Sequence, residues 1–428
     1  MTSLRILTSL HTLPDTKSMM TLFFESILPV LKTKADVHMI WLIYMPEKLN
    51  LPIKADQSNT ILDIHDYENA VEVLKIAKPD VIFAESGYPI IDYALSLAGK
   101  YLNIPVVSFF FSVPKLHISR LKLNISYFTR FFESNVPTET NKKIMSRGRF
   151  FLYKYLFLLK TQKSLKTSNI QLLKNFFTML KIYSKQTKEQ YFSMFENSLH
   201  WLEGEDIIEP LTAAGYDRTK LVVTGNPMFD AVIKKMQERK QTSKTDNKIN
   251  VLFVPAPLWE HGIWTKNQQE NLIKQIILNI SKHKNKIFLT IKIHPSIAQF
   301  SQYESIIHAI DPSIPIYQKG DVLDFLLDAD VVISFSSFTS AISYALIFKK
   351  PIIICNIYDD EKDTYVEKKL ALECKDPSTI VDVIQKIISS NPALNNEADE
   401  FFREYTYKPD GHASERLCNS LIKLIEKK

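Results

Sequence analysis

Short apolar runs alternate with longer stretches in which apolar residues recur every three or four positions. Short apolar runs of this kind are typical of buried strands. The longer stretches, such as Lys17–Leu31 and Pro89–Leu102, have the period of amphipathic helices. In the first half of the chain we therefore expect strands at Leu4–Leu10, Val37–Tyr44, Val81–Ala84, Val106–Ser112, His200–Glu203 and Leu221–Thr224.

The same alternation resumes after QERKQTSKTDNK, a polar stretch without apolar periodicity. Strands that alternate with helices need crossover connections, which produce parallel sheets covered on both faces. A chain of 428 residues is long enough for two such units, since single cores stop growing at about 250–300 residues. In the second half we expect strands at Asn250–Pro255, Lys286–Ile293, Ile314–Tyr317, Val331–Ser334 and Pro351–Cys355, and closing helices near Pro377–Ser389 and Ala413–Lys427.

The predicted fold class is α/β, with two Rossmann-like lobes and a helical basic insertion in the N-terminal lobe. We assign residues 1–236 to the N-terminal lobe, with its insertion at about 114–198, and residues 237–248 to a linker. Residues 249–400 form the C-terminal lobe, and residues 401–428 form a C-terminal helix that can pack back on the first lobe.

The insertion concentrates the positive charge of the chain. Residues 120–190 contain 15 Lys and Arg but three acidic residues, in a chain whose net charge is +6. A basic helix with Phe, Tyr and Leu side chains, such as RFFLYKYLFLLK at 149–160, suits an anionic membrane surface, where each basic residue contributes about 1 kcal/mol. Peripheral contact through residues 118–190 is one interpretation, and a helical flap with a solvated basic face is the other. The segment contains no nucleic-acid recognition module, so we expect no nucleic acid as a partner.

Composition excludes several classes of protein. Apolar residues make up 45% of the chain and charged residues 23%, as in folded globular proteins. Nine glycines nearly exclude a Gly-rich phosphate loop, so an anion site must use other chemistry. The cysteines, Cys355, Cys374 and Cys418, are too few and too far apart for a zinc knuckle or a disulfide framework.

The N-terminus, MTSLRILTSLHTLPD, lacks the basic region and long apolar core of a signal peptide. No uncharged apolar run reaches the ~18–20 residues needed to cross a bilayer. We therefore expect a cytoplasmic protein, with any membrane contact peripheral and at the inner face of the cell membrane.

The hydroxyl-rich segment SFSSFTS, residues 334–340, joins a predicted strand to a predicted helix. The free N–H groups and the dipole at a helix N-terminus favour an anion. Ser336, Ser337, Thr339 and Ser340 add hydroxyl donors at the same place, and Ser334 lies just before them. One hydroxyl is enough to cap a helix, so this concentration of hydroxyl groups indicates a phosphate-binding turn.

Two further motifs follow predicted strands. IKIHPS ends a buried strand in His294 and Pro295, at the carboxyl end where ligands bind in open parallel sheets. An imidazole there can donate to a phosphate oxygen or protonate a leaving group, and the alternative is a bond to a loop carbonyl. VTGNPMFD places Asn226 in a tight turn after a first-lobe strand, where it either reaches the ligand or serves the turn alone.

These motifs, together with DGHASERL at 410–417, resemble nucleotide-sugar transferases of the GT-B architecture. The resemblance is to bacterial polysialyltransferases, capsule Kdo-transferases and CDP-glycerol glycerophosphotransferases, and more distantly to the UDP-N-acetylglucosamine 2-epimerase superfamily. It covers about Leu199 to the C-terminus, and only the order of strands before that. The resemblance implies that the second lobe holds the nucleotide and the first lobe holds the acceptor, with a cleft between them.

In those families the His-Pro histidine and the paired serines contact the donor phosphates, a role that carries over to His294, Ser336 and Ser337. A carboxylate one turn further along the helix often holds the ribose. This chain has Ser343 and Tyr344 in that neighbourhood, and the acids at 359–361 are candidate substitutes.

An inverting transferase also needs a general base in the first lobe. Glu85, just past the strand at Val81–Ala84, is the best-placed candidate, and a turn or N-cap role is its structural alternative. His11, beyond the first strand, is the second candidate for the base or for an acceptor contact.

The leading hypothesis is a metal-independent glycosyltransferase without a cofactor. It moves a sugar from a nucleotide-activated donor to a surface-polysaccharide or lipid-linked glycan acceptor. We expect no metal, because no compact Asp-x-Asp pair stands in a suitable setting. The alternatives are a CDP-glycerol-type glycerophosphotransferase, an epimerase of the related superfamily, and a catalytically inactive binding protein of the same fold. The epimerase is disfavoured because no acidic residue follows the predicted strand Val106–Ser112.

Overall fold

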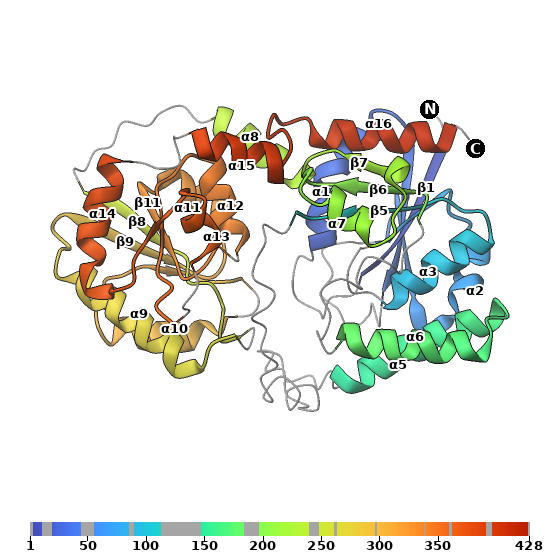
Figure 1. The fold of residues 1–428 in the computed structure, drawn as a ribbon, viewed down its shortest axis with the longest axis horizontal. Helices are drawn as coiled ribbons and strands as arrows, with labels where there is room; N and C mark the ends of the chain where they lie inside the picture. The colour runs from blue at the N-terminus through green and yellow to red at the C-terminus, as the bar shows by residue number, and fades with distance from the viewer. Residues whose placement is uncertain are drawn as a thin grey trace.

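The computed structural model describes residues 3–10, 19–43, 55–84, 90–112, 147–183, 197–238, 248–260, 263–295, 298–337, 339–358, 362–390 and 396–426. These residues form two α/β lobes, which stand side by side in Figure 1 with the first lobe on the right. The predicted fold class, α/β with two Rossmann-like lobes, is confirmed.

A parallel sheet of seven strands forms the core of the first lobe in the described part of the chain. Its strands are β1 (Ser3–Leu10), β2 (Asp36–Ile43), β3 (Asn59–Asp63), β4 (Val81–Phe83), β5 (Val106–Phe110), β6 (Leu199–Leu202) and β7 (Leu221–Val223). They lie in the order β3-β2-β1-β4-β5-β6-β7, and every neighbouring pair is parallel. The order runs outward from β1 in both directions, so the connections are the crossovers that the alternating pattern predicts.

Helices cover both faces of this sheet. Those of the first lobe are α1 (Met19–Lys32), α2 (Ala70–Ala77), α3 (Ile90–Tyr101), α5 (Arg147–Ser164), α6 (Asn169–Tyr183) and α7 (Ile208–Ala213), joined by α16 (Ala413–Glu426) from the C-terminus. Phe23 of α1 and Leu417 of α16 pack in the cluster on one face, and Leu158 of α5 packs with α2 and α3 on the other. Neighbouring residues of β1 serve opposite faces, Ile6 the first and Leu7 the second, as the pleat requires.

The second lobe contains a parallel sheet of six strands among the described residues. They are β8 (Ile249–Phe253), β9 (Ile287–Lys292), β10 (Ile316–Tyr317), β11 (Val331–Ser334), β12 (Ile352–Ile354) and β13 (Leu372–Glu373). Their order is β10-β9-β8-β11-β12-β13, again with parallel pairs throughout. All residues of β11 and β12 are buried, because helices cover this sheet on both faces.

The helices packed on the second sheet include one that precedes the linker. They are α8 (Pro227–Glu238), α9 (Lys266–Ser281), α10 (Phe300–His308), α11 (Val322–Asp328), α12 (Ser340–Ile347), α13 (Thr364–Glu367), α14 (Ile380–Ser389) and α15 (Asn396–Tyr405). Thr265 and Gln268 form a reciprocal capping box that starts α9. α8 belongs to this lobe by packing, because Phe229 and Val232 join the cluster that contains Ile342 of α12.

The strands expected from the sequence lie close to observed ones, but β3 and β13 were not predicted. Both lie at the edge of their sheet, where a strand has a neighbour on one side only. β3 reads NTILD and β13 reads LE, so neither has the continuous apolar run that led to the prediction of β7 (LVV), which also lies at an edge.

Within the insertion, α5 and α6 form a helical hairpin on the outer side of the first lobe, at the lower right of Figure 1. Phe157 and Leu158 of α5 pack with α2 and α3. The Tyr155 and Phe176 rings join α5 to α6 edge-on, with their centroids 5.0 Å apart. The predicted helical insertion is therefore present, and α6 is its outer helix.

Candidate functional site

The carboxyl edge of the second sheet collects most of the predicted site residues. His294 and Pro295 follow β9, and the serine-rich turn at 335–340 follows β11. β8 is the one strand between β9 and β11, so the two segments leave the sheet roughly 10 Å apart. The strands are parallel, so both segments lie at the edge where such sheets bind ligands. The structure therefore brings the His-Pro and Ser-Ser motifs to one edge.

Lys292, two residues before His294, fixes the backbone at the end of β9. Lys292 ends β9 with a buried side chain, and its ammonium donates to the carbonyl oxygens of Ile293 at 3.2 Å and Gln318 at 2.8 Å. Burial lowers the pKa of Lys292. His294 itself is half-buried, and Pro295 is exposed. Lys292 is thus a structural residue that holds the strand end from which His294 projects.

The paired serines donate to a carboxylate of the protein. Asp363 Oδ2 accepts hydrogen bonds from Ser337 N–H at 2.8 Å, from Ser337 Oγ at 3.0 Å and from Ser336 Oγ at 3.3 Å. Asp363 Oδ1 accepts from Tyr365 N–H and so caps α13. Asp363 is 8% exposed, so it is held in this position by its surroundings. The turn can therefore bind an anionic oxygen, and Asp363 supplies one here.

The remaining hydroxyl residues stand at the start of α12. Ser334 Oγ donates to the carbonyl of Ser336 at 3.1 Å, within the turn. Thr339 is the N-cap residue, but its side chain makes no capping bond. Ser340 begins the helix and is exposed. The capping alternative does not describe Thr339, and donor binding by Thr339 and Ser340 stays a prediction.

Ser343 and Tyr344, one turn further along α12, both contact the protein. Ser343 Oγ lies 3.3 Å from the Tyr365 hydroxyl. The Tyr344 ring meets Phe229 of α8 edge-on, with centroids 5.8 Å apart. Burial raises the pKa of Tyr344 to about 12, and the negative charge of Glu203 adds to the effect. A first-lobe carboxyl group therefore lies near the helix that begins at the serine-rich turn.

Glu203 was not predicted as a site residue. It follows β6 at the carboxyl edge of the first sheet and is 6% exposed. Its Oε1 accepts from Asn226 Nδ2 at 3.1 Å, and its Oε2 accepts from Ser112 N–H at 2.9 Å. Burial raises the pKa of Glu203 to about 8, so the carboxyl group is mostly uncharged at neutral pH.

Asp206, which is half-buried, and Asn226, which is buried, also belong to this cluster. Asp206 accepts from Ser112 Oγ at 2.5 Å, and burial raises its pKa to about 6. Asn226 Oδ1 accepts from Met228 N–H at 3.0 Å, while its amide nitrogen bonds Glu203. Both ends of the Asn226 amide thus bond the protein, and its role in donor binding stays a prediction. The signal that could have found Glu203 is its place directly after β6, where parallel sheets put ligand residues.

Other predicted residues lie outside the described part of the chain. These are the two candidates for the general base, Glu85 and His11, and the acids at 359–361. The described ranges contain no group of three or more His, Cys, Asp or Glu side chains able to hold a metal ion. Metal independence stays a prediction, as do the roles of Glu85 and His11.

Solved structures share this arrangement of two lobes. The wall teichoic acid polymerase TagF is 13% identical with a TM-score of 0.55, over 99% of this chain and 89% of that chain. MnaA of S. aureus, solved with UDP, is 14% identical with a TM-score of 0.55, over 99% of this chain and 98% of that one. The UDP-GlcNAc 2-epimerase of Neisseria meningitidis, bound to UDP-GlcNAc, is 15% identical with a TM-score of 0.53, over 98% and 100%. At these identities the likeness shows the fold, which is of the predicted GT-B type.

A family match is more specific than the fold. No curated protein matches the chain. Residues 97–423 match the family described as CDP-Glycerol:Poly(glycerophosphate) glycerophosphotransferase. The match covers more than half of the chain and takes in Glu203, Asn226, His294, the serine-rich turn and the DGHASERL segment. The predicted resemblance to the CDP-glycerol group is confirmed, and the chain belongs to the CDP-glycerol:poly(glycerophosphate) glycerophosphotransferase family.

Proposed function

We propose that this protein transfers glycerol phosphate from a CDP-activated donor to a hydroxyl group of a glycerophosphate polymer. The observation that carries the proposal is the family match over residues 97–423, which includes the site residues of the second sheet together with Glu203 and Asn226 of the first lobe. Sugar transfer, the leading hypothesis from the sequence, has weaker support, because the matched family is one of glycerophosphotransferases. The alternative drawn from the sequence therefore becomes the main proposal.

The proposed reaction is an in-line displacement at phosphorus. The acceptor oxygen bonds to the phosphorus that carries glycerol, the bond from that phosphorus to the bridging oxygen breaks, and CMP departs. The acceptor proton passes to a first-lobe base, for which Glu85 and His11 are the candidates. His294 donates a proton or a hydrogen bond to the departing phosphate. Positioning and charge stabilisation supply most of the rate in such transfers.

Donor binding at the serine-rich turn requires a local exchange of partners. A serine hydroxyl has one proton to donate, and the hydroxyl groups of Ser336 and Ser337 both donate to Asp363. Either proton must turn from Asp363 to the donor phosphate before the hydroxyl can donate to it. Asp363 holds the two hydroxyl groups at the sheet edge until the phosphate replaces it as acceptor.

The proposal predicts which donor is consumed. Purified protein should release CMP from CDP-glycerol when a glycerophosphate primer is present, and little without it. UDP-N-acetylglucosamine and a CMP-linked sugar should release no nucleotide under the same conditions. Chromatography of the nucleotides measures the release, and mass spectrometry of the primer detects each added glycerol phosphate.

The same assay separates the alternatives. Sugar added to an acceptor with release of nucleotide would restore the glycosyltransferase hypothesis. UDP released from UDP-N-acetylglucosamine without an acceptor would indicate an epimerase. No turnover with any donor, in protein that binds nucleotide, would support a binding protein that lacks activity.

We further propose that α5 and α6 bind an anionic membrane surface, and that the protein reaches its polymer acceptor there. No helix in the described ranges is long and apolar enough to span a membrane. Five large apolar side chains of this hairpin are nevertheless 45–72% exposed, namely Leu152, Leu156, Ile170, Leu173 and Phe177. Exposed lysines accompany them, namely Lys160, Lys163, Lys166 and Lys174. Apolar side chains beside lysines suit the boundary between headgroups and acyl chains.

Neutralising these four lysines with glutamine should weaken binding to phosphatidylglycerol vesicles by about tenfold or more, since each contributes up to about 1 kcal/mol. Cosedimentation with vesicles measures the binding. The matched control changes four exposed lysines of the second lobe, Lys274, Lys282, Lys284 and Lys286, and should bind as the wild type does. Equal losses of vesicle binding in both variants would mean that net charge alone causes the effect. No loss of binding in the α5–α6 variant would mean that these helices have a structural role.

A further inference from the structure

Within the described ranges the chain crosses between the lobes twice, along neighbouring segments. It leaves the first sheet after β7 and enters α8, whose Phe229 and Val232 pack on the second lobe. It returns after α15, whose Phe401 packs in that same cluster, and enters α16, whose Leu417 packs on the first lobe. Figure 1 shows α8, α15 and α16 together at the top of the junction.

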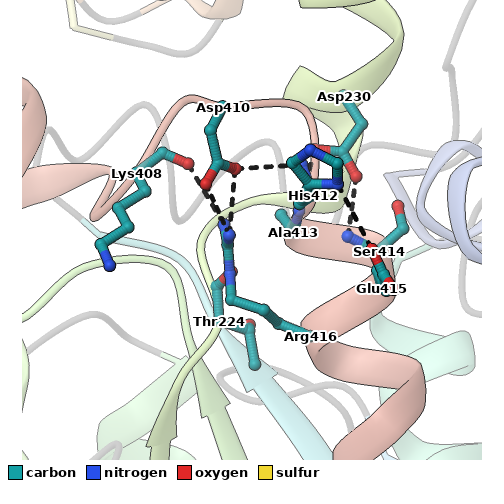
Figure 2. Close-up of polar contacts among 9 residues, drawn as sticks. All are labelled: Thr224, Asp230, Lys408, Asp410, His412, Ala413, Ser414, Glu415 and Arg416. Carbon is teal, nitrogen blue, oxygen red and sulfur yellow. Dashed lines mark hydrogen bonds and ion pairs between the residues drawn. The ribbon is translucent and has the colours of Figure 1, made fainter.

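Arg416 joins the two crossing segments, as Figure 2 shows. Its Nε donates to the carbonyl of Thr224, in the outgoing segment, at 2.8 Å. Its Nη1 donates to both carboxylate oxygens of Asp410, in the returning segment, at 2.9 Å each. Its Nη2 donates to the carbonyl of Lys408 at 3.2 Å. One guanidinium group therefore bonds both crossings.

A second link joins the same two segments. Asp230, in the first turn of α8, accepts from the N–H groups of Ala413 at 3.1 Å and Ser414 at 2.7 Å. These are the first N–H groups of α16, which lack partners within the helix. The carboxylate also suits the positive end of the helix dipole. The outgoing helix thus caps the returning one, across more than 180 residues of sequence.

The backbone of the outgoing segment is shaped to admit the arginine. Gly225 has a φ of +80°, and a Cβ there would lie 3.1 Å from Arg416 Nη2. The guanidinium also lies over the Tyr407 ring, 5.4 Å from its centroid. The planar, forked guanidinium group holds its partners in one geometry more strictly than an ammonium group can.

We propose that Arg416 is a positioning residue that fixes the orientation of the two lobes during transfer. The inference rests on the proposed function, in which His294 acts from the second lobe and the acceptor lies on the first. A misplacement of the reacting atoms by about 1 Å can cost about 10²-fold in rate, so freedom of the lobes to move relative to each other lowers the rate. Arg416 lies at the crossings rather than at the donor turn, so donor binding does not depend on it.

Arg416→Lys should lower kcat by about tenfold and leave the KM for the donor within about twofold, because a lysine keeps the charge and loses the fork. Asp410→Asn removes the bidentate acceptor from the other side and should have the same effect. Arg403→Lys is the matched control. Arg403 is an exposed residue of α15 that pairs with Glu400 alone among the described ion pairs, and its replacement should change neither constant.

A distance measurement tests, without any substrate, whether the Arg416 contacts fix the orientation of the lobes. Spin labels at Lys75→Cys in α2 and Lys386→Cys in α14 report the separation of the lobes, and the native cysteines are buried. Pulsed electron paramagnetic resonance should show a broader distribution of label distances in Arg416→Lys and Asp410→Asn than in the wild type. Arg403→Lys should leave the distribution narrow. An unchanged width in both test variants overturns the proposal. Absence of turnover in the wild type would contradict the proposed function. The distance measurement would still test whether Arg416 fixes the orientation of the lobes.

Discussion

Replacing His294 with alanine is expected to lower the rate of CMP release by about 10²-fold or more, the usual contribution of a positioned acid or base. The histidine follows β9 at the carboxyl edge, one strand away from β11 and its serine-rich turn. Lys292 holds this strand end through two carbonyl oxygens, so the substitution should not displace the backbone. Single-turnover kinetics with CDP-glycerol and primer measures the chemical step.

His294→Gln separates the two chemical roles of the imidazole. A glutamine amide can donate a hydrogen bond to a phosphate oxygen, but it cannot release a proton. If His294 protonates departing CMP, the glutamine variant should bind CDP-glycerol as the wild type does and still turn over slowly. His283, before the amino end of the same strand, supplies the control, since His283→Ala changes a histidine at the opposite edge of the sheet. A His294→Ala variant with an unchanged rate would exclude both roles.

The fold could be predicted because its central strands and helices carry their period in the sequence. β11 is buried throughout and apolar up to Ser334 at its end, and the helices between strands keep one apolar face. The rule that ligands bind beyond the carboxyl ends of parallel strands then placed His294 and the paired serines at one edge, and the structure confirms that placement. β3 and β13 were not predicted because their sequences, NTILD and LE, contain no such apolar run.

The polar partners could not be predicted, since their burial depends on contacts between distant segments. Asp363 stands beside the acidic run DDEK at 359–362, which has the composition of an exposed loop. The start of α13 places its carboxylate against Ser337, 26 residues earlier in the chain. Glu203 owes its burial to Ser112 and Asn226, which follow β5 and β7. No periodicity in the sequence encodes such pairings.

From the sequence, the DGHASERL segment was interpreted only through its resemblance to a family. The structure shows which contacts the segment makes. Its aspartate, Asp410, and its arginine, Arg416, form a bidentate ion pair at the crossing between lobes. Its Ala413 and Ser414 present N–H groups to Asp230 in the VTGNPMFD segment. Two motifs that are far apart in the chain are therefore the two halves of one junction.

Glu203→Gln is expected to make the protein more stable in alkaline solution. Burial raises the pKa of Glu203 to about 8, so the folded protein keeps a proton that the unfolded chain releases above its ordinary pKa of 4.5. The free energy of unfolding therefore falls as pH rises from about 4.5 to about 8 and then stays level, because the folded state must bury a charge. Each unit of raised pKa corresponds to about 1.4 kcal/mol, so the rise from 4.5 to about 8 corresponds to on the order of 5 kcal/mol at pH 9. The variant should gain this amount less about 1 kcal/mol for its imperfect amide bond.

The comparison of pH 5 with pH 9 distinguishes this charge from a packing effect. Glutamine has nearly the shape of the protonated carboxyl group, so at pH 5 the variant should equal the wild type or lose about 1 kcal/mol for an imperfect bond to Asn226. At pH 9 the order should reverse, which urea denaturation at both pH values measures. Glu205→Gln removes an exposed carboxylate two residues away and should leave the pH dependence unchanged. A constant difference between Glu203→Gln and the wild type across this range would mean that Glu203 is charged in the folded protein at neutral pH, and that the junction between the lobes tolerates a buried anion.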